Sequence, residues 1–167
     1  LEEGLVEPDT EYIDTGKVEL GGPAIYNFEK KVWGKQTMAA VLENSINTGA
    51  IFVEQKLGKD LFLKYIDNFG FFDKTGIDLQ GEIYSRNETL KRGYPRDFAS
   101  ASFGQGIQLT SLQLVRAFSA LANGGTLVKP HIVEKIVFAD GQEKTTQIKE
   151  GARVISEAAV AKITAML

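Results

Sequence analysis

Serine and asparagine side chains spaced to act together occur twice in the chain, as Ser45-Ile46-Asn47 and Ser85-Arg86-Asn87. Ser45 lies where two amphipathic helical patterns meet. There, a hydroxyl and an amide can both point into one cleft as hydrogen-bonding groups for a polar ligand. Ser85 lies in a polar stretch with nothing around it to exclude water. The triplet is frequent by chance, and a serine that merely ends a helix is the structural alternative for Ser45.

Three other patterns resemble known kinds of site, and each favours a structural role. Gly104-Gln105-Gly106 begins like a dinucleotide loop, but it lacks the third glycine and a preceding strand, so it predicts a tight turn. His131 has no carboxylate partner by spacing, which favours a structural histidine over the base of a serine triad. The acidic N-terminal residues lack calcium-loop spacing and predict a solvated surface rather than a cation site. They are Glu2, Glu3, Glu7, Asp9, Glu11 and Asp14.

Composition excludes several classes of function. The 167 residues include 19 basic and 22 acidic side chains, so no basic excess exists to bind nucleic acid. The longest apolar runs fall far short of the ~20 residues that span a bilayer. The chain has no cysteine and one histidine, and we predict neither a metal site nor a cofactor. The hydrophobic fraction of 43% and the length together predict one folded domain.

The spacing of apolar residues predicts the helices and strands that must position Ser45. The expected helices around it cover 37–44, 50–57 and 59–69, with a break at 45–49. A clear helix follows Thr110, and its face of Leu114, Phe118 and Leu121 is expected to be deeply buried. The other expected elements are strands over 17–20 and 24–27, a loop over 71–97, a hairpin of 131–138 with 144–148, and a last helix capped by Ser156.

A series of short segments, each weak alone, follows in a characteristic order. They are Leu1–Val6, Asp14–Gly16, Thr37–Gly49, Lys56–Gly58, Phe69–Phe71, Thr75–Leu79, Gly81–Glu82, Phe103–Gly106, Thr110–Leu121, Ala122–Gly125 and Val154–Glu157. In this order they resemble the transpeptidase domain of class B penicillin-binding proteins, the serine enzymes that cross-link peptidoglycan. The segments at Asp14 and Thr75 favour class B over the bifunctional class A relatives.

The resemblance implies a fold and a domain organisation. The fold is α+β, of the serine β-lactamase and transpeptidase type, mainly its helical subdomain with part of its antiparallel sheet. The chain would be a partial transpeptidase domain over 1–167. Within it we expect a mostly helical subdomain over 1–125, a β-hairpin over 126–149, and a helix over 150–167 that leads toward a strand outside this chain.

The family carries three motifs around one cleft, S-x-x-K, S-x-N and K-T-G, and the chain has S-x-N in the matching place. No serine is followed by a lysine three residues later. The resemblance implies that S-x-x-K lies upstream of Leu1 and the functional K-T-G downstream of Leu167. Lys74-Thr75-Gly76 matches K-T-G in letters, but it follows a helix instead of forming an edge strand, so we predict a structural loop.

The resemblance also implies roles for individual residues. Ser45 would relay a proton from the lysine of S-x-x-K to the leaving amine, and Asn47 would hydrogen-bond the substrate carbonyl and that lysine. Phe28 matches an aromatic position lining the cleft, with core packing as the alternative, and Thr48 is assigned to substrate binding with it. The attacking serine would lie outside this chain, so the chain alone is expected to be inactive.

The implied partners are peptidoglycan stem peptides and β-lactams, with proteins of cell division or elongation as further candidates and no nucleic acid. The implied location is the bacterial cell envelope, at the outer face of the cytoplasmic membrane. Membrane contact would come only through parts of the protein outside this chain. The alternatives are a non-catalytic interaction domain on the same scaffold, a serine β-lactamase, and an unrelated small helical binding protein. The long segment 1–22 favours a transpeptidase over a β-lactamase.

Overall fold

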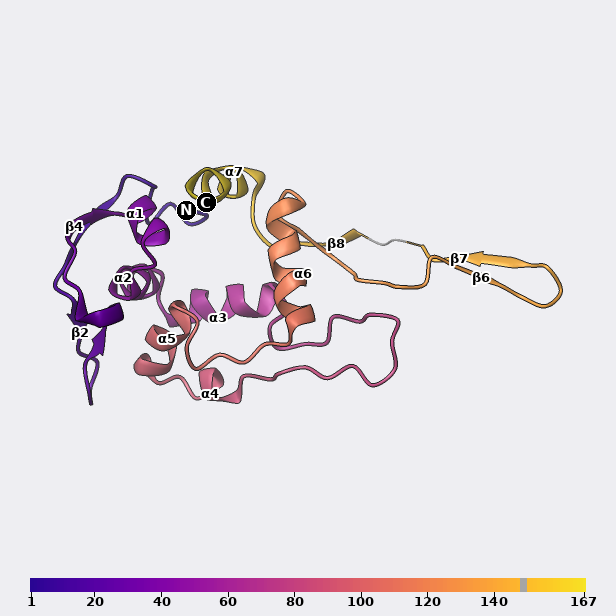
Figure 1. Cartoon of the computed structure of the whole chain (residues 1–167), viewed down its shortest axis with the longest axis horizontal. Coiled ribbons are helices and arrows are strands. Elements are labelled where there is room, and N and C mark those ends of the chain that lie inside the picture. Colours follow the sequence, from indigo (N-terminus) through magenta and orange to yellow (C-terminus); the bar gives the residue numbers. More distant parts are fainter. Residues whose placement is uncertain (148–149) are drawn as a thin grey trace.

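The computed structural model describes residues 1–147 and 150–167, with short strands at one end, helices in the middle and a long ribbon at the other end (Figure 1). The helices are α1 (Met38–Glu43), α2 (Asn47–Leu57), α3 (Lys59–Asn68), α4 (Glu88–Lys91), α5 (Pro95–Ser102), α6 (Ser111–Ala122) and α7 (Glu157–Met166), and a 3-10 turn, η1, covers Phe28–Lys30. The strands are β1 (Glu11–Asp14), β2 (Lys17–Val18), β3 (Ile25–Tyr26), β4 (Gly34–Thr37), β5 (Thr126–Val128), β6 (Lys135–Val137), β7 (Glu143–Thr145) and β8 (Glu150–Arg153).

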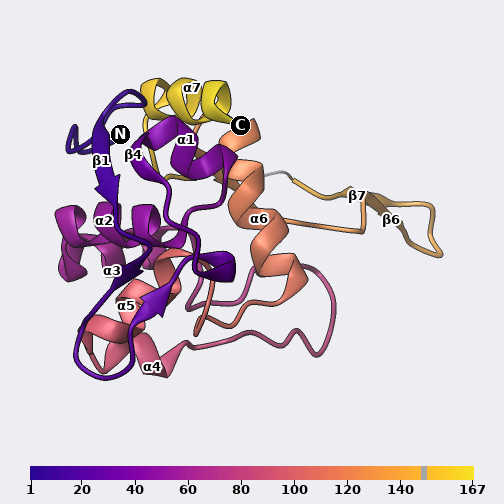
Figure 2. The same ribbon diagram turned by 60° about the vertical axis from the view of Figure 1, so that its left-hand side comes forward.

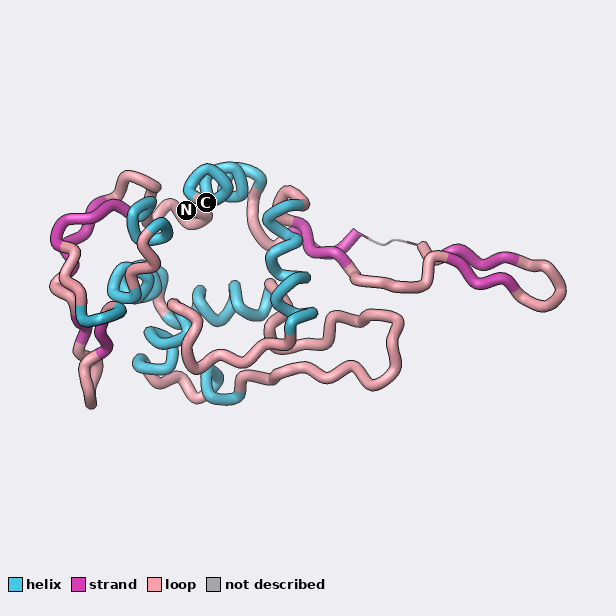
Figure 3. The backbone as a smooth tube through the Cα atoms, viewed as in Figure 1, coloured by secondary structure: helices cyan, strands magenta, loops and turns pink. Residues whose placement is uncertain are grey.

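The strands form antiparallel pairs at the two ends of the molecule (Figure 3). The predicted β2–β3 pair is confirmed in shorter form, with Val18 opposite Ile25. The sequence did not predict the pair β1–β4, in which Glu11 lies opposite Thr37. The inward face of β1 carries Tyr12 and Asp14, and the buried acid interrupts the apolar alternation that marks a strand.

The predicted helix caps are confirmed. The Thr37 hydroxyl accepts a hydrogen bond from the Ala40 N–H, and the Ser156 hydroxyl accepts one from Ala159. Thr110 and Gln113 form a capping box, in which each side chain bonds the backbone of the other. These caps hold the first turns of α1, α6 and α7 in place.

Helix α2 begins at Asn47 rather than at the predicted Ala50, so Gly49 lies inside its first turn. Gly49 is needed for close packing and not for a break. A Cβ atom built there would lie 2.8 Å from Val41 Cγ1 and 3.0 Å from the Tyr12 hydroxyl. The absent side chain therefore lets α2 lie directly against α1 and β1.

The predicted loop over 71–97 is partly helical. It contains the short helix α4 and the start of α5, which begins with Pro95 in its first turn. Helix α5 buries Phe98, Ala99 and Ala101 against α2, α3 and α4. In the sequence, the proline at its start and its small residues did not indicate a helix, although proline fits the first turn of a helix. The stretch from 71 to 87 is irregular, as predicted.

The core around the Ser45 segment comes from α1, α2 and the N-terminal strands. One cluster joins Met38, Val41 and Ile46 to Val6 and Tyr12, with Trp33, Phe52, Val53 and Met166 packed against it. A second cluster contains Ile25, Ile51 and Ala99. The start of α2 at Ile46 and its middle at Ile51 are therefore fixed by buried apolar contacts.

The predicted burial of one face of α6 is wrong. Phe118 is 60% exposed and Leu114 is 43% exposed, whereas Gln113, Ala117 and Ala120 are buried. The small Ala120 packs in a cluster with Leu127 of β5 and Val154, so the helix approaches its neighbours through its small residues. A sequence pattern ranks large apolar residues as core, but in the described chain no element covers that side of α6.

The predicted hairpin is confirmed as the shorter pair β6–β7, which extends away from the helices (Figure 1). The expected end of its second strand at Ile148 lies outside the described residues. A helix was expected over residues 150–153, but these residues are not helical. They form β8, which pairs with β5 before α7 begins.

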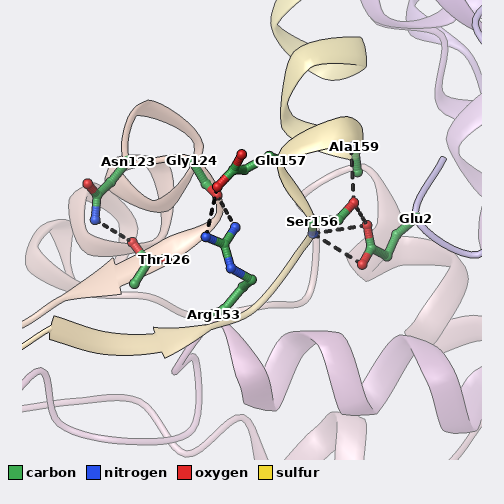
Figure 4. A network of polar contacts seen from close by, with 8 residues as sticks. All are labelled: Glu2, Asn123, Gly124, Thr126, Arg153, Ser156, Glu157 and Ala159. Carbon is green, nitrogen blue, oxygen red and sulfur yellow. Dashed lines mark hydrogen bonds and ion pairs between the residues drawn. The ribbon is translucent and has the colours of Figure 1, made fainter.

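The N-terminal segment lies beside α7 in both ribbon views (Figures 1 and 2). The Glu2 carboxylate accepts hydrogen bonds from the Ser156 N–H and hydroxyl, the latter at 2.6 Å, as Figure 4 shows. Nearby, Arg153 bonds the Gly124 carbonyl and Glu157. Glu7 pairs with Lys162 at 2.6 Å. Glu2 and Glu7 thus each bind a separate part of the C-terminal segment.

Candidate active site

Ser45 is exposed between α1 and α2 and adopts an unusual backbone conformation. Its φ is +51°, in the left-handed region that residues with a side chain rarely enter. The N–H groups on each side of the bend remain satisfied: Ser45 donates to Leu42 and Ile46 donates to Val41. A non-glycine residue held in this region costs free energy and is often found at functional sites.

Ile46, the middle residue of the triplet, is buried and fixes the triplet to the core. It is 2% exposed and packs in the cluster with Met38 and Val41. Ser45 is exposed and Asn47 is half-buried on either side of it. Ser45 and Asn47 are therefore both accessible on either side of a buried residue, and their action in one cleft stays a prediction.

Asn47 begins α2 and links it to β3. Its amide nitrogen donates to the Tyr26 carbonyl at 3.0 Å. One N–H group of this amide is thereby used to fix the side chain, while the second N–H and the carbonyl oxygen keep their bonding capacity. The sequence did not indicate that the segment around Tyr26 would hold Asn47.

Thr48 lies in a buried polar network. Its hydroxyl donates to Asp14 at 2.7 Å and approaches the Asn27 side-chain carbonyl at 3.1 Å and the Tyr12 hydroxyl at 3.3 Å. Thr48 is 4% exposed. This burial gives its side chain a supporting role, and a direct substrate contact by Thr48 stays an untested prediction.

Asp14 is the centre of that network and is 2% exposed. In addition to Thr48, it accepts hydrogen bonds from the Gly16 N–H at 2.8 Å, the Asn27 amide at 2.9 Å and the Trp33 N–H at 2.7 Å. Burial alone would raise the pKa of Asp14, but these donors outweigh burial and hold the pKa below its ordinary value. Asp14 is therefore a buried, charged acceptor with every lone-pair direction in use.

Phe28 is 80% exposed, in the 3-10 turn that directly follows Asn27. Core packing, the alternative for this residue, is therefore wrong within the described chain. The Tyr26 carbonyl that holds Asn47 is two residues away in the chain. Asn47 and the segment carrying Phe28 are thus brought together.

The second Ser-x-Asn triplet has a different environment. Asn87 is buried, and its side chain donates to the carbonyls of Phe71 and Gln108 and accepts from the Gln108 N–H. Those three bonds use its amide to hold two loops together. Ser85 is itself half-buried, so the expectation that nothing around this triplet excludes water is wrong, and the position of Ser85 outside the site stays a prediction.

Lys74-Thr75-Gly76 forms a loop without a strand. The Glu82 carboxylate accepts from the Thr75 N–H at 2.6 Å, its hydroxyl at 2.7 Å and the Gly76 N–H at 3.1 Å. Burial favours a higher pKa for Glu82, but these donors lower the pKa below its ordinary value. The structure thus agrees with a structural loop here.

His131 is exposed and lies near the Asp78 carboxylate, a neighbour that the spacing of the sequence did not indicate. Asp78 accepts hydrogen bonds from the N–H groups of Val133 and Ile132, which lower the pKa of its carboxyl group. The Asp78 carboxylate therefore fixes the loop after Gly76 to the base of the ribbon. No exposed nucleophile is seen hydrogen-bonded to His131 in the described chain.

Within residues 1–147 and 150–167, no group of histidine and acidic residues is arranged to hold a metal ion. None of the described helices is long and apolar enough to cross a membrane.

Glu54 was not singled out by the sequence. It is 7% exposed, lines an apolar cavity of about 430 Å³, and burial raises the pKa of its carboxyl group.

Comparison with known proteins gives the site its context. The chain is 39% identical over 151 residues to stage V sporulation protein D of Bacillus subtilis, covering 88% of the chain and 23% of that protein. It is 27% identical to penicillin-binding protein PbpB of Mycobacterium tuberculosis, covering 100% of the chain and 25% of that protein. The chain thus spans about a quarter of the length of these curated relatives.

A solved structure agrees with the sequence comparison. Penicillin-binding protein 3 of Mycobacterium tuberculosis, complexed with aztreonam, superposes with a TM-score of 0.87 at 27% identity, over 99% of this chain and 37% of that one. The α+β transpeptidase fold is thereby confirmed. The family described as the penicillin-binding protein transpeptidase domain matches residues 1–167. The chain therefore belongs to the penicillin-binding protein transpeptidase family.

Proposed function

We propose that the complete protein carrying this chain is a peptidoglycan D,D-transpeptidase, which cross-links stem peptides through a serine acyl-enzyme and is acylated by β-lactams. The single observation that carries the proposal is the Ser45–Asn47 triplet, held at one surface by a left-handed serine and a buried isoleucine. Family membership supports it, as do the aztreonam and ampicillin complexes of the similar penicillin-binding protein 3.

In the proposed reaction, a serine outside this chain attacks the D-Ala–D-Ala amide, and the acyl group passes from the leaving amine to that serine oxygen. Ser45 relays a proton to the leaving amine. Asn47 donates its remaining N–H to the substrate carbonyl and orients the catalytic lysine. The exposed ring of Phe28 lines the approach to these groups.

Partners and location follow as proposals. Stem peptides and β-lactams are the ligands of the site, and proteins of cell division or elongation are partners of the complete protein. The family works in the bacterial cell envelope, and we place the site at the outer face of the cytoplasmic membrane, with any anchor supplied by other parts of the protein.

Labelling of the complete protein with fluorescent penicillin tests the proposal. We expect the wild type to be labelled, and Ser45→Ala or Asn47→Ala to slow labelling by ~10²–10⁴-fold without a change in melting temperature, the range for a positioned proton-transfer group. Ser85→Ala is the matched control in the other triplet and is expected to label at the wild-type rate. Equal losses at Ser45 and Ser85 would contradict the assignment of the site.

A further inference from the structure

A buried carboxylate lies directly behind the proposed site and joins three chain segments that are distant in sequence. Asp14 is bonded to its own turn at Gly16, to the segment of Asn27 and Trp33, and to Thr48 at the start of α2. A buried charge is stable only when donors surround it, so the three segments are held together by a shared acceptor.

Two of these segments, the start of α2 and the segment of Asn27, lead to residues of the site. Thr48 directly follows Asn47, and its N–H donates to the Asn27 side-chain carbonyl at 3.1 Å. The segment that contains Asn27 also supplies the Tyr26 carbonyl, which accepts from Asn47 at 3.0 Å. Asn27 thus receives a bond from α2 and gives one to Asp14 at 2.9 Å. The position of Asn47 relative to Phe28 depends on this network.

We propose that Asp14 is a positioning residue of the acyl-transfer site, acting through Thr48 and Asn27 to hold Ser45 and Asn47 in their working geometry. The inference rests on the proposed function and assigns a new residue to it. Asp14 is 2% exposed, so it acts through other groups and not by touching a substrate. Ser45 is held at a φ of +51°, a conformation that persists only while the surrounding structure imposes it.

The test uses the complete protein and the rate of acylation by fluorescent penicillin. Asp14→Asn keeps the shape of the side chain but turns one acceptor atom into a donor that faces other donors. We expect acylation to slow by up to ~100-fold, because a displacement of about 1 Å at a reacting group has that effect. Asp67→Asn, on the exposed surface of α3, is the matched control and is expected to acylate normally.

A second pair of variants separates positioning from folding. Thr48→Val removes the hydroxyl and keeps the shape, whereas Thr48→Ser keeps the hydroxyl that donates to Asp14. We expect Val to slow acylation and Ser to recover most of the rate, with each rate measured well below the melting temperature of the variant because Val leaves the buried carboxylate one donor short. This pair decides the question if Asp14→Asn does not fold.

Combined variants provide a comparison of acylation rates that would not change if Asp14 had only a structural role. If Asp14 acts through Ser45 and Asn47, Asp14→Asn is expected to reduce the rate much less in a background that carries both Ser45→Ala and Asn47→Ala than in the wild type. The same fold-loss in both backgrounds, or a folded Asp14→Asn protein with the wild-type rate, would overturn the inference alone. A wild-type protein that penicillin does not label would instead contradict the proposed function.

Discussion

Two single residues, one just before α2 and one in its first turn, shape the site. Ser45 is held in a left-handed conformation, and Gly49 lets the helix approach Val41 and Tyr12. Both features set the direction in which α2 leaves the triplet. The neighbouring elements already fill the space that a side chain at position 49 would need, so glycine fits there.

Gly49→Ala tests this close approach. Helix propensity alone would favour alanine by about 1 kcal/mol. We expect the opposite result, a loss of about 1–3 kcal/mol in the free energy of unfolding, because the new methyl group overlaps Val41 Cγ1 and the Tyr12 hydroxyl. Urea unfolding followed by the fluorescence of Trp33 measures the difference, and a stabilised variant would contradict the packing argument.

At the scale of elements, α6 shows how burial departs from hydrophobicity. Its buried face consists of Gln113, Ala117 and Ala120, and Gln113 donates to the Phe71 and Asp73 carbonyls. The helix is thus held by a capping glutamine and by small residues. Leu114, Val115 and Phe118 remain exposed in the described chain, whereas Leu121 is half-buried.

A pair of phenylalanine substitutions in the 167-residue chain tests that assignment. Phe98 of α5 is 1% exposed, and Phe98→Ala is expected to lower the free energy of unfolding by ~3–5 kcal/mol. Phe118 of α6 is 60% exposed, and Phe118→Ala is expected to change it by no more than about 0.5 kcal/mol. Urea unfolding of both variants provides the comparison, and equal losses would mean that the exposed face of α6 is covered.

At the scale of the whole molecule, segments distant in sequence meet at both sides of the helices. Glu2 bonds Ser156, Glu7 pairs with Lys162, and β1 pairs with β4. The 167 residues contain no serine followed three positions later by lysine. The chain therefore supplies the proton relay of the proposed reaction without its activated nucleophile.

The isolated 167-residue chain is consequently expected to form no covalent adduct with fluorescent penicillin. A serine hydroxyl without an adjacent base is a weak nucleophile, so the covalent step itself is missing. Gel fluorescence together with the intact mass of the chain provides the measurement, with the complete protein as the positive control. A mass increase of one penicillin on any serine of this chain would contradict the proposed division of roles.

The sequence by itself determined the helix caps, the family and the loop character of Lys74, and it predicts Ser45 rather than Ser85 as the residue of the site. These depend on short-range patterns: a hydroxyl before a helix, an apolar period, and motifs in a fixed order. Thr37, Thr110 and Ser156 all cap the predicted helices for this reason.

Only the tertiary structure decided the burial and hydrogen bonding of Asp14 and Thr48, the need for Gly49, and the exposure of Phe118. Asp14 read as one of several surface acids, yet it is 2% exposed because donors from Gly16 to Thr48 converge on it. Burial is a property of what lies opposite a residue, and the opposing groups come from distant parts of the chain. No local pattern records them, so the support of the site became visible only when the chain was folded.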